Sequence, residues 1–429
     1  METKNDIFQS KDYITSRRGY VSRCAFDYFM TILVSDAYLA KLLTSIGVSD
    51  AIAGIIASFI SLAFVFQLLS IFLVEHIKSV KKTTIFFEMV GHLSFMMIYI
   101  IPFLPIGISA KTILVMVCML VAYFAKYLIS GTLFAWGNSF VSPDNRGKFS
   151  ASKEIISLVS GLVFTLVISR FVDKFESLGN LNGAFLFIAI TMLVLNILNF
   201  FSIMQIKDTK NEKVQKHDLK LVLKKTFGNK NFRGITILHI LWNIARYTTM
   251  GFMGTYKTKE LLMTVGMVQI INIIGLAVRA VISRPFGKYS DKTSYAKGFS
   301  LALLIAAAGF GINAFSSPDR IWCVVLFVIM DQVSMAGTSE NSFNMTYSYV
   351  ESDYIVQAMA IKNSIGGLVG FGATLIGSRI LFAVQQNGNS LYGMTVYGQQ
   401  VLSAISCVVV IITFLFNYFV VEKQKVMKQ

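Results

Sequence analysis

The sequence predicts an all-α polytopic membrane protein, with about twelve transmembrane helices in two pseudo-symmetric six-helix bundles. The 429 residues are 55% hydrophobic and 14% charged, with a mean hydropathy of +0.63, whereas soluble domains are about 25% charged. Apolar runs of about 20 residues, each long enough to cross roughly 30 Å of hydrocarbon, recur along the chain. These runs do not alternate with a period of two, which excludes membrane β-strands and leaves helices.

Breaks rich in charge, Gly or Pro divide the apolar runs into separate spans. The predicted spans lie at 21–43, 51–74, 83–105, 112–139, 153–176, 183–206, 233–257, 264–285, 295–316, 321–345, 355–383 and 398–421. One long polar stretch separates six of them from the other six. We therefore expect a cytoplasmic segment at 1–20, a first bundle at 21–206, a basic linker at 207–232, a second bundle at 233–421 and a cytoplasmic tail at 422–429.

Basic residues gather in alternate loops. Lys and Arg are frequent before the first span and after the second, fourth, sixth, eighth and twelfth spans, whereas intervening loops such as 44–50 and 385–398 are nearly free of them. The positive-inside rule places both termini and the linker in the cytoplasm. We expect the protein to lie in the cell membrane. The net charge of +16 is then a topology signal, and we expect no nucleic-acid partner. Within the linker, helical spacing of apolar residues over 218–227 favours an amphipathic helix at the inner membrane surface, the alternative being a plain solvated linker.

The two halves of the chain resemble each other. Residues 141–161, between spans four and five, align without a gap with 350–370, between spans ten and eleven. Parallel repeats of this kind are common in secondary transporters. The identical pairs are Val141 with Val350, Asp144 with Asp353, Lys153 with Lys362 and Gly161 with Gly370.

A charged stretch, RPFGKYSDKTSYAK at 284–297, follows the eighth span. It contains Gly287, then three residues, Asp291 and Lys292, and later a further Lys. A degenerate copy follows the second span with Glu75 in place of the Asp, and PDNRGK, with Arg146, follows the fourth span. These motifs, together with the topology, linker and repeat over essentially the whole chain, resemble the major facilitator superfamily.

The charged stretch also has a physical interpretation. Gly287 lacks a side chain, so two helix ends can approach closely there. Asp291 supplies an anion that can lie at the positive end of a neighbouring helix or against an Arg or Lys. The resemblance implies a cytoplasmic conformational gate made of Gly287, Asp291, Lys292, Glu75 and Arg146, and the alternative is a loop that only fixes topology.

Charged residues inside spans predict functional sites, because burying them in lipid is costly. Lys126, Arg246 and Asp331 fall near the centres of spans four, seven and ten, and Asp36 lies slightly outside the centre of span one. The resemblance independently assigns these four helices to the translocation path. With polar and aromatic neighbours on the same helices, the predicted substrate-binding or coupling residues are Asp36, Lys126, Tyr127, Trp242, Arg246, Asp331 and Glu340.

Two alternatives accompany this interpretation. The charges can instead pair as Asp36 with Lys126 and Arg246 with Asp331, and a buried pair that exchanges partners can respond to a solute or a proton. The carboxylates Asp36, Asp331 and Glu340 are candidates for proton coupling. Charges nearer the span ends are expected to extend to the membrane surface, and these are Glu88, Lys153, Glu154, Arg170, Lys257, Lys362 and Arg379.

The leading functional expectation is a secondary active transporter that moves a small polar organic solute, sugar-like or an organic anion, by alternating access. Uptake by proton or cation symport is favoured, since the fifth span lacks the Gly-Pro pair of the family's antiporters. Drug or metabolite efflux by proton antiport is the alternative, followed by a lipid flippase or a receptor of the same fold.

The sequence lacks the motifs of enzymes, metal-binding proteins and disulfide-rich proteins. The four His residues are scattered and no Ser/His/Asp set, metal-ligand spacing or phosphate-binding loop occurs, so we expect neither an enzyme nor a cofactor or metal. The four Cys residues lie in separate spans, which does not fit a disulfide framework. The expected partners are a solute, a co-transported proton or sodium ion and the lipid bilayer, and the expected state is a monomer.

Overall fold

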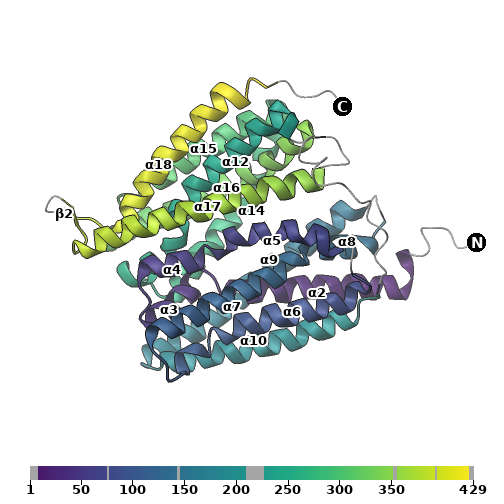
Figure 1. Cartoon of the computed structure of the whole chain (residues 1–429), viewed down its shortest axis with the longest axis horizontal. Helices are drawn as coiled ribbons and strands as arrows, with labels where there is room; N and C mark the ends of the chain where they lie inside the picture. Colours follow the sequence, from purple (N-terminus) through teal and green to yellow (C-terminus); the bar gives the residue numbers. More distant parts are fainter. Residues whose placement is uncertain are drawn as a thin grey trace, which may run out of the picture. The chain divides into compact units, whose positions relative to one another are not determined.

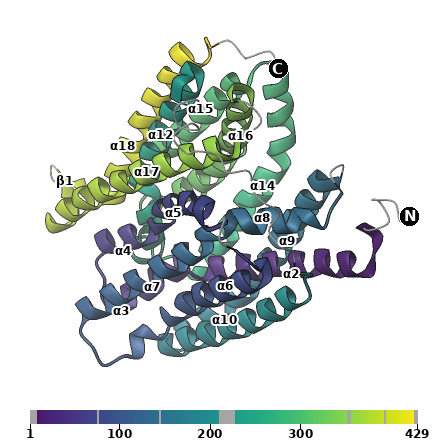
Figure 2. The ribbon, with the colours of Figure 1, turned by 45° about the vertical axis from the view of Figure 1, so that its right-hand side comes forward.

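The computed structural model describes residues 8–74, 77–142, 145–208, 227–350, 355–391 and 394–424. Within these ranges the chain is helical apart from its turns and one short hairpin (Figures 1 and 2). It divides into two compact units, one made of 1–48 and 66–215 and the other of 49–65 and 216–429. The gate candidate Glu75 and nearly all of the amphipathic helix predicted over 218–227 lie outside the described residues.

The first unit is a helical bundle in which α10 lies along both α2 and α6 (Figures 1 and 2). Helices α2 and α3 are bent by 42° at the break between them. The elements are α2 (Lys11–Leu33), α3 (Asp36–Ile46), the C-terminal part of α5 (Phe59–Val74), α6 (Val80–Met97), the 3₁₀ turn η1 (Ile101–Phe103), α7 (Ile108–Leu128), α8 (Ser130–Ser139), α9 (Arg146–Ser177) and α10 (Leu181–Met204).

The second unit packs α12 along α17 and α18, and α15 along α16 and α18. Its helices are α4 (Asp50–Ala57), residues 59–65 of α5, α12 (Lys230–Thr249), α13 (Met253–Thr255), α14 (Val265–Lys292), α15 (Tyr295–Asn313), α16 (Ile321–Tyr349), α17 (Ile355–Gln386) and α18 (Gly398–Phe416). Shorter turns are η3 (Met250–Phe252), η4 (Tyr256–Glu260), η5 (Pro318–Arg320) and η7 (Asn417–Val421). Strands β1 (Ser390–Leu391) and β2 (Met394–Thr395) pair antiparallel.

The exterior of the described helices carries apolar stripes suited to lipid. On α9, the exposed residues Val159, Val163 and Val167 are four apart and therefore share one face. Soluble monomers seldom expose contiguous apolar surface of this kind. Among the described residues, nine helices are long and apolar enough to cross a membrane, and the bent pair α2 and α3 makes a tenth. The helices of the predicted third and seventh spans, α6 and α12, carry three charged residues each, so the count of about twelve spans stays a prediction for these two.

The charged stretch at 284–297 is largely helical. Helix α14 continues through Pro285 and Gly287 and ends at Lys292, seven residues beyond the predicted end of the eighth span. The next helix starts directly afterwards, because the Ser294 hydroxyl accepts from the backbone N of Lys297 at 3.2 Å and caps α15. The motif is therefore the last turns of one helix and the cap of the next.

Helix α4 is fixed inside the second unit by close backbone contact and by a buried charge. A Cβ atom on Gly251 would lie only 2.6 Å from the carbonyl oxygen of Gly54, so the two segments meet backbone to backbone. Asp50 is 1% exposed and accepts from Lys259 Nζ at 3.0 and 3.1 Å and from Gln385 Nε2 at 2.6 Å. The start of the predicted second span therefore belongs to the second unit by packing.

Candidate transport site

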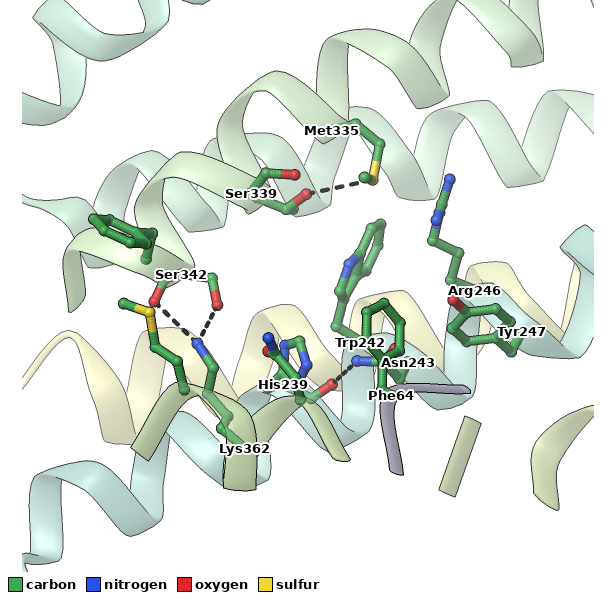
Figure 3. A pocket seen from close by; sticks show the side chains of 14 residues that line it. Phe64, His239, Trp242, Asn243, Arg246, Tyr247, Met335, Ser339, Ser342 and Lys362 are labelled. Carbon is green, nitrogen blue, oxygen red and sulfur yellow. Dashed lines mark hydrogen bonds between the residues drawn. The ribbon is translucent and has the colours of Figure 1, made fainter. Parts of the chain in front are cut away.

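A cavity of about 320 Å³ lies within the second unit, between α12, α16 and α17, with Phe64 of α5 at one side (Figure 3). Helix α12 presents His239, Trp242 and Arg246 to it, at spacings of three and four residues that place them on one helical face. Lys362 of α17 is the second cation in the wall. No Asp or Glu occurs among the described residues that line the cavity.

Arg246 is held by a carboxylate behind the cavity wall. Its Nη2 atom lies 3.3 Å from Oδ2 of Asp331 on α16, one of the two ion pairs that the sequence offered as an alternative. Asp331 is 4% exposed, and three nearby polar atoms are buried without a hydrogen-bond partner among the described residues: Arg246 Nε, Asp331 Oδ1 and Ser334 Oγ. The two charges of the pair therefore cancel, but some of the polar atoms in and beside it have no hydrogen-bond partner among the described residues. These atoms can bond to a solute or a water at this end of the cavity.

The sequence predicted that Lys362 extends to the membrane surface, but the structure places its side chain inside the second unit. The residue is only 3% exposed, and its Nζ donates to the Ser342 carbonyl at 3.2 Å and the Ser342 hydroxyl at 2.9 Å (Figure 3). It also donates to the Thr346 hydroxyl at 2.8 Å. No carboxylate oxygen of a described residue lies within 4.0 Å of it. The prediction was wrong because α16 supplies hydroxyl partners inside the unit, so the ammonium has no need to reach water.

The side of the cavity formed by α12 and α17 depends on a glycine. A Cβ atom on Gly366 of α17 would lie 2.5 Å from the His239 ring and 3.0 Å from Asn243 Nδ2. Only glycine allows the two helices this distance, which brings Lys362 and the α12 face to the same cavity.

The first unit contains a separate cluster of charges. Lys126 Nζ on α7 lies 3.1 and 3.0 Å from the two carboxylate oxygens of Asp27 on α2, and donates to the Thr31 hydroxyl at 2.6 Å. The alternative pairing of Lys126 with Asp36 is therefore wrong. Asp36 begins α3 at the bend, half-buried and with a φ of 45°, after α2 has ended at Leu33. Tyr127 follows Lys126 and is half-buried.

A second ion pair lies one turn away on the same helix. Arg23 of α2 pairs with Glu88 of α6, and Glu88 also accepts from Asn199 Nδ2 of α10 at 2.7 Å. Glu88 is buried, so the expectation that it extends to the membrane surface was wrong, for the same reason as at Lys362: its polar partners lie inside the bundle.

His92 connects this cluster to α10. Its Nε2 atom lies 3.3 Å from Asp27 Oδ1, and its Nδ1 atom lies 3.3 Å from Asn196 Oδ1. A hollow of about 10 Å³ adjoins His92, Asp27, Arg23, Glu88 and Lys126, which is close to the volume that one water needs. Five ionisable side chains from three helices thus surround a space of about one water.

Comparisons with known proteins identify the fold family. The family model of the Major Facilitator Superfamily matches residues 21–374. The chain belongs to the Major Facilitator Superfamily. It is therefore a multi-pass membrane protein of a transporter family, and no curated protein matches its sequence.

Solved structures of superfamily transporters share the fold over nearly the whole chain. The nucleoside transporter NupG is 12% identical with a TM-score of 0.69, over 97% of this chain and 100% of that one. An auto-inhibited peptide transporter of the POT family is 10% identical with a TM-score of 0.72, over 98% of both chains. The fucose:proton symporter FucP of E. coli is 15% identical with a TM-score of 0.51, over 96% and 98%. At these identities the likeness concerns the fold alone.

The residues of the superfamily's loop motif lie on α14. The Cβ position of Gly287 is 3.8 Å from Glu340 Oε2 of α16, so the glycine faces that helix. Asp291 and Lys292 are exposed in the last turn of α14, and no Lys or Arg among the described residues lies within 4.0 Å of the Asp291 carboxylate. Arg146 is exposed at the start of α9 in the first unit.

Sequence reasoning missed Arg23, Asp27, His92 and His239. The predicted first span began at 21, which placed Arg23 and Asp27 near its end, whereas α2 begins at Lys11 and puts Asp27 deep within the helix. The signal was present, because Arg23 and Asp27 are four residues apart and so share a helical face within a predicted span. No signal in a single sequence indicates that His239 and Lys362 line one cavity, since their helices are distant in the chain.

Proposed function

We propose that the protein is a secondary active transporter that takes up a small polar organic solute by alternating access, in symport with a proton or another cation. The observation that carries this proposal is the cavity of about 320 Å³ with two cations and Trp242 in its wall. Its size lies within the range of roughly 300–1,000 Å³ typical of small-ligand sites, and a few placed polar groups among apolar and aromatic ones are the usual lining.

The charges of the cavity favour a sugar-like or anionic solute with a single acidic group. Asp331 neutralises Arg246, whereas Lys362 has only neutral partners among the described residues. An isolated buried charge is costly, and an anionic group of the solute would compensate it. The Ser342 hydroxyl accepts from Lys362 and keeps its own proton to donate to that group.

The same charges weigh against the alternative of drug efflux. Carboxylates would favour a cationic solute, but the described residues of the cavity wall provide none, and both of its charged side chains are cations. The proposal keeps Asp36, Lys126 and Tyr127 as substrate-binding or coupling residues of the first unit. It keeps Gly287, Asp291, Lys292, Glu75 and Arg146 as residues of the cytoplasmic gate.

A solute screen of the purified protein tests the proposal. Neutral sugars, sugar acids, amino acids and lipophilic cations are each added, and the thermal unfolding midpoint is measured, because a bound solute stabilises the folded state by mass action. We expect sugar acids to raise the midpoint and lipophilic cations to leave it unchanged, and the stabilising solutes to enter proteoliposomes down an imposed proton gradient. Stabilisation by lipophilic cations alone would support efflux, and binding without flux would support a receptor.

A further inference from the structure

His92 is buried, and its two ring nitrogens contact partners on two other helices. The side chain is 3% exposed, and both ring nitrogens face oxygen atoms, Asp27 Oδ1 on one side and Asn196 Oδ1 on the other. A neutral imidazole offers one donor and one acceptor, whereas the imidazolium offers two donors. Two facing oxygens therefore suit the charged ring.

Asn196 allows the neutral ring to be satisfied as well. Rotation of its amide by half a turn exchanges oxygen and NH₂, so that the amide donates to Nδ1 while Nε2 continues to donate to Asp27. A buried group that keeps both hydrogen bonds in both states avoids the cost of an unpaired polar atom. His92 can therefore gain and lose a proton while its ring keeps both of its own hydrogen bonds.

We propose that His92 is the site that takes up and releases the coupled proton, and that its protonation releases Lys126 from Asp27. This inference rests on the proposed function, and it names a residue that the sequence did not single out. The proton adds to the Nδ1 lone pair and leaves from the same atom, so no other bond forms or breaks.

The link to Lys126 is the shared oxygen of Asp27. Both His92 Nε2 and Lys126 Nζ are directed at Asp27 Oδ1, at 3.3 and 3.1 Å. While the ring is neutral, Lys126 is the cation that balances Asp27. Once the ring is charged, it provides that balance itself, and the two cations repel each other.

A census of the surrounding charges indicates which group moves. Helix α2 contributes Arg23 and Asp27, α6 contributes Glu88 and α7 contributes Lys126, while α10 adds only the amides Asn196 and Asn199 and α8 adds no charge. Two cations and two carboxylates balance until the proton adds a third cation. The Lys126 side chain is 26% exposed against 8% for Arg23, so Lys126 is the cation that leaves most easily.

This arrangement makes proton binding and solute binding support each other. Lys126 is one of the predicted substrate-binding residues, and its release from Asp27 frees its ammonium group to donate hydrogen bonds within the first unit. By linkage, a solute bound to Lys126 also favours protonation of His92. The hollow of about 10 Å³ beside the ring is close to the volume that one water needs, and such a water would give the proton a route to the ring.

NMR of the protein with isotope-labelled histidine in lipid nanodiscs tests the inference without any solute. The chain has four His residues, and the His92→Gln variant identifies the His92 signal. We expect both the doubly protonated ring and the Nε2–H form of His92 to be observed as the pH is varied. In Asp27→Asn, the doubly protonated share at one chosen pH should fall at least about threefold, because the carboxylate that stabilises the cation is lost.

Asn196 provides the matched control. Asn196→Asp keeps the size and the acceptor but cannot donate to a neutral ring, so it should raise the doubly protonated share, whereas Asn196→Leu should not. A single protonation form over the whole pH range, or an unchanged share in Asp27→Asn, would overturn the inference.

Flux in proteoliposomes separates this inference from the proposed function. With glucuronate as the probe, His92→Gln should lower accumulation driven by a pH gradient at least about tenfold, but glucuronate counterflow less than about threefold. Equal losses of both would make His92 a structural residue. Absence of glucuronate flux in the wild type would contradict the proposed function, and the NMR result would still decide the role of His92.

Discussion

Arg246 Nη2 lies 3.3 Å from Asp331 Oδ2, so the carboxylate of α16 neutralises one of the two cations in the cavity wall. The pair connects α12 to α16, two of the three helices that form the cavity. This relationship divides the cavity into a neutral end at Arg246 and a cationic end at Lys362.

Replacing Arg246 by Met should destabilise the protein by about 3 kcal/mol, because it leaves Asp331 buried without its cation. The double variant Arg246→Met with Asp331→Leu should recover most of this stability, since an apolar pair of similar volume replaces the charges. Chemical unfolding of the detergent-purified protein measures both. Equal destabilisation of the single and double variants would show that the charge balance does not matter.

Lys362→Met should weaken binding of a sugar acid at least about tenfold, the loss expected for a hydrogen-bonded charged partner. Binding of the corresponding neutral sugar should change less, because it does not need the ammonium. Isothermal titration or thermal shift with matched acid and neutral sugars measures the difference. Lys297→Met is the control, since that lysine is exposed at the start of α15. An equal loss of affinity for the acid and the neutral sugar would show that Lys362 does not bind an anionic group.

Asp50→Asn should lower the free energy of unfolding by about 1–3 kcal/mol, because a buried acceptor of three hydrogen bonds loses its charge. The matched control is Asp12→Asn. Asp12 pairs with Lys207 at 3.5 Å on the surface, and exposed pairs contribute little. Thermal unfolding of the two variants side by side measures the contrast, and similar midpoints would show that the α4 contact is not stabilised by this charge.

Asp291→Asn should slow solute turnover roughly tenfold while solute affinity changes less than about threefold, as expected when a gate shifts a conformational equilibrium by about 1.4 kcal/mol. Gly287→Leu should act in the same direction, because its side chain would meet Glu340, 3.8 Å from the Cβ position. Initial rates in proteoliposomes and equilibrium binding in detergent measure the two quantities. Asp291→Glu, which keeps the charge, is the control. Unchanged turnover in Asp291→Asn would contradict the role of Asp291 in the gate.

The sequence identified the general architecture because that architecture depends on local properties. Apolar runs of membrane length predicted the helices, and the motif at 284–297 indicated the superfamily. Trp242 and Arg246 are four residues apart, a helical spacing that is visible in the sequence, and both line the cavity. These inferences need only neighbours within one segment, which a single sequence displays.

The partners of buried charges were harder to predict, because they come from other helices. Sequence reasoning offered Asp36 as an alternative partner of Lys126, but α2 ends at Leu33 and the acceptor in the structure is Asp27, within α2. It assigned Glu88 and Lys362 to the membrane surface, whereas Arg23 and Asn199 bind the first and hydroxyls of α16 bind the second. Each error came from a helix boundary or a partner helix that no local pattern specifies.

The sequence by itself determined that the chain is a helical membrane protein of a transporter family, because hydrophobic length, charge bias and short motifs are written along the chain. Only the tertiary structure decided that Lys362 and Arg246 line one cavity and that His92 lies between Asp27 and Asn196. The physical reason is that a charge inside a bundle is stabilised by whichever polar groups the packing brings within hydrogen-bond distance, and packing joins residues far apart in sequence.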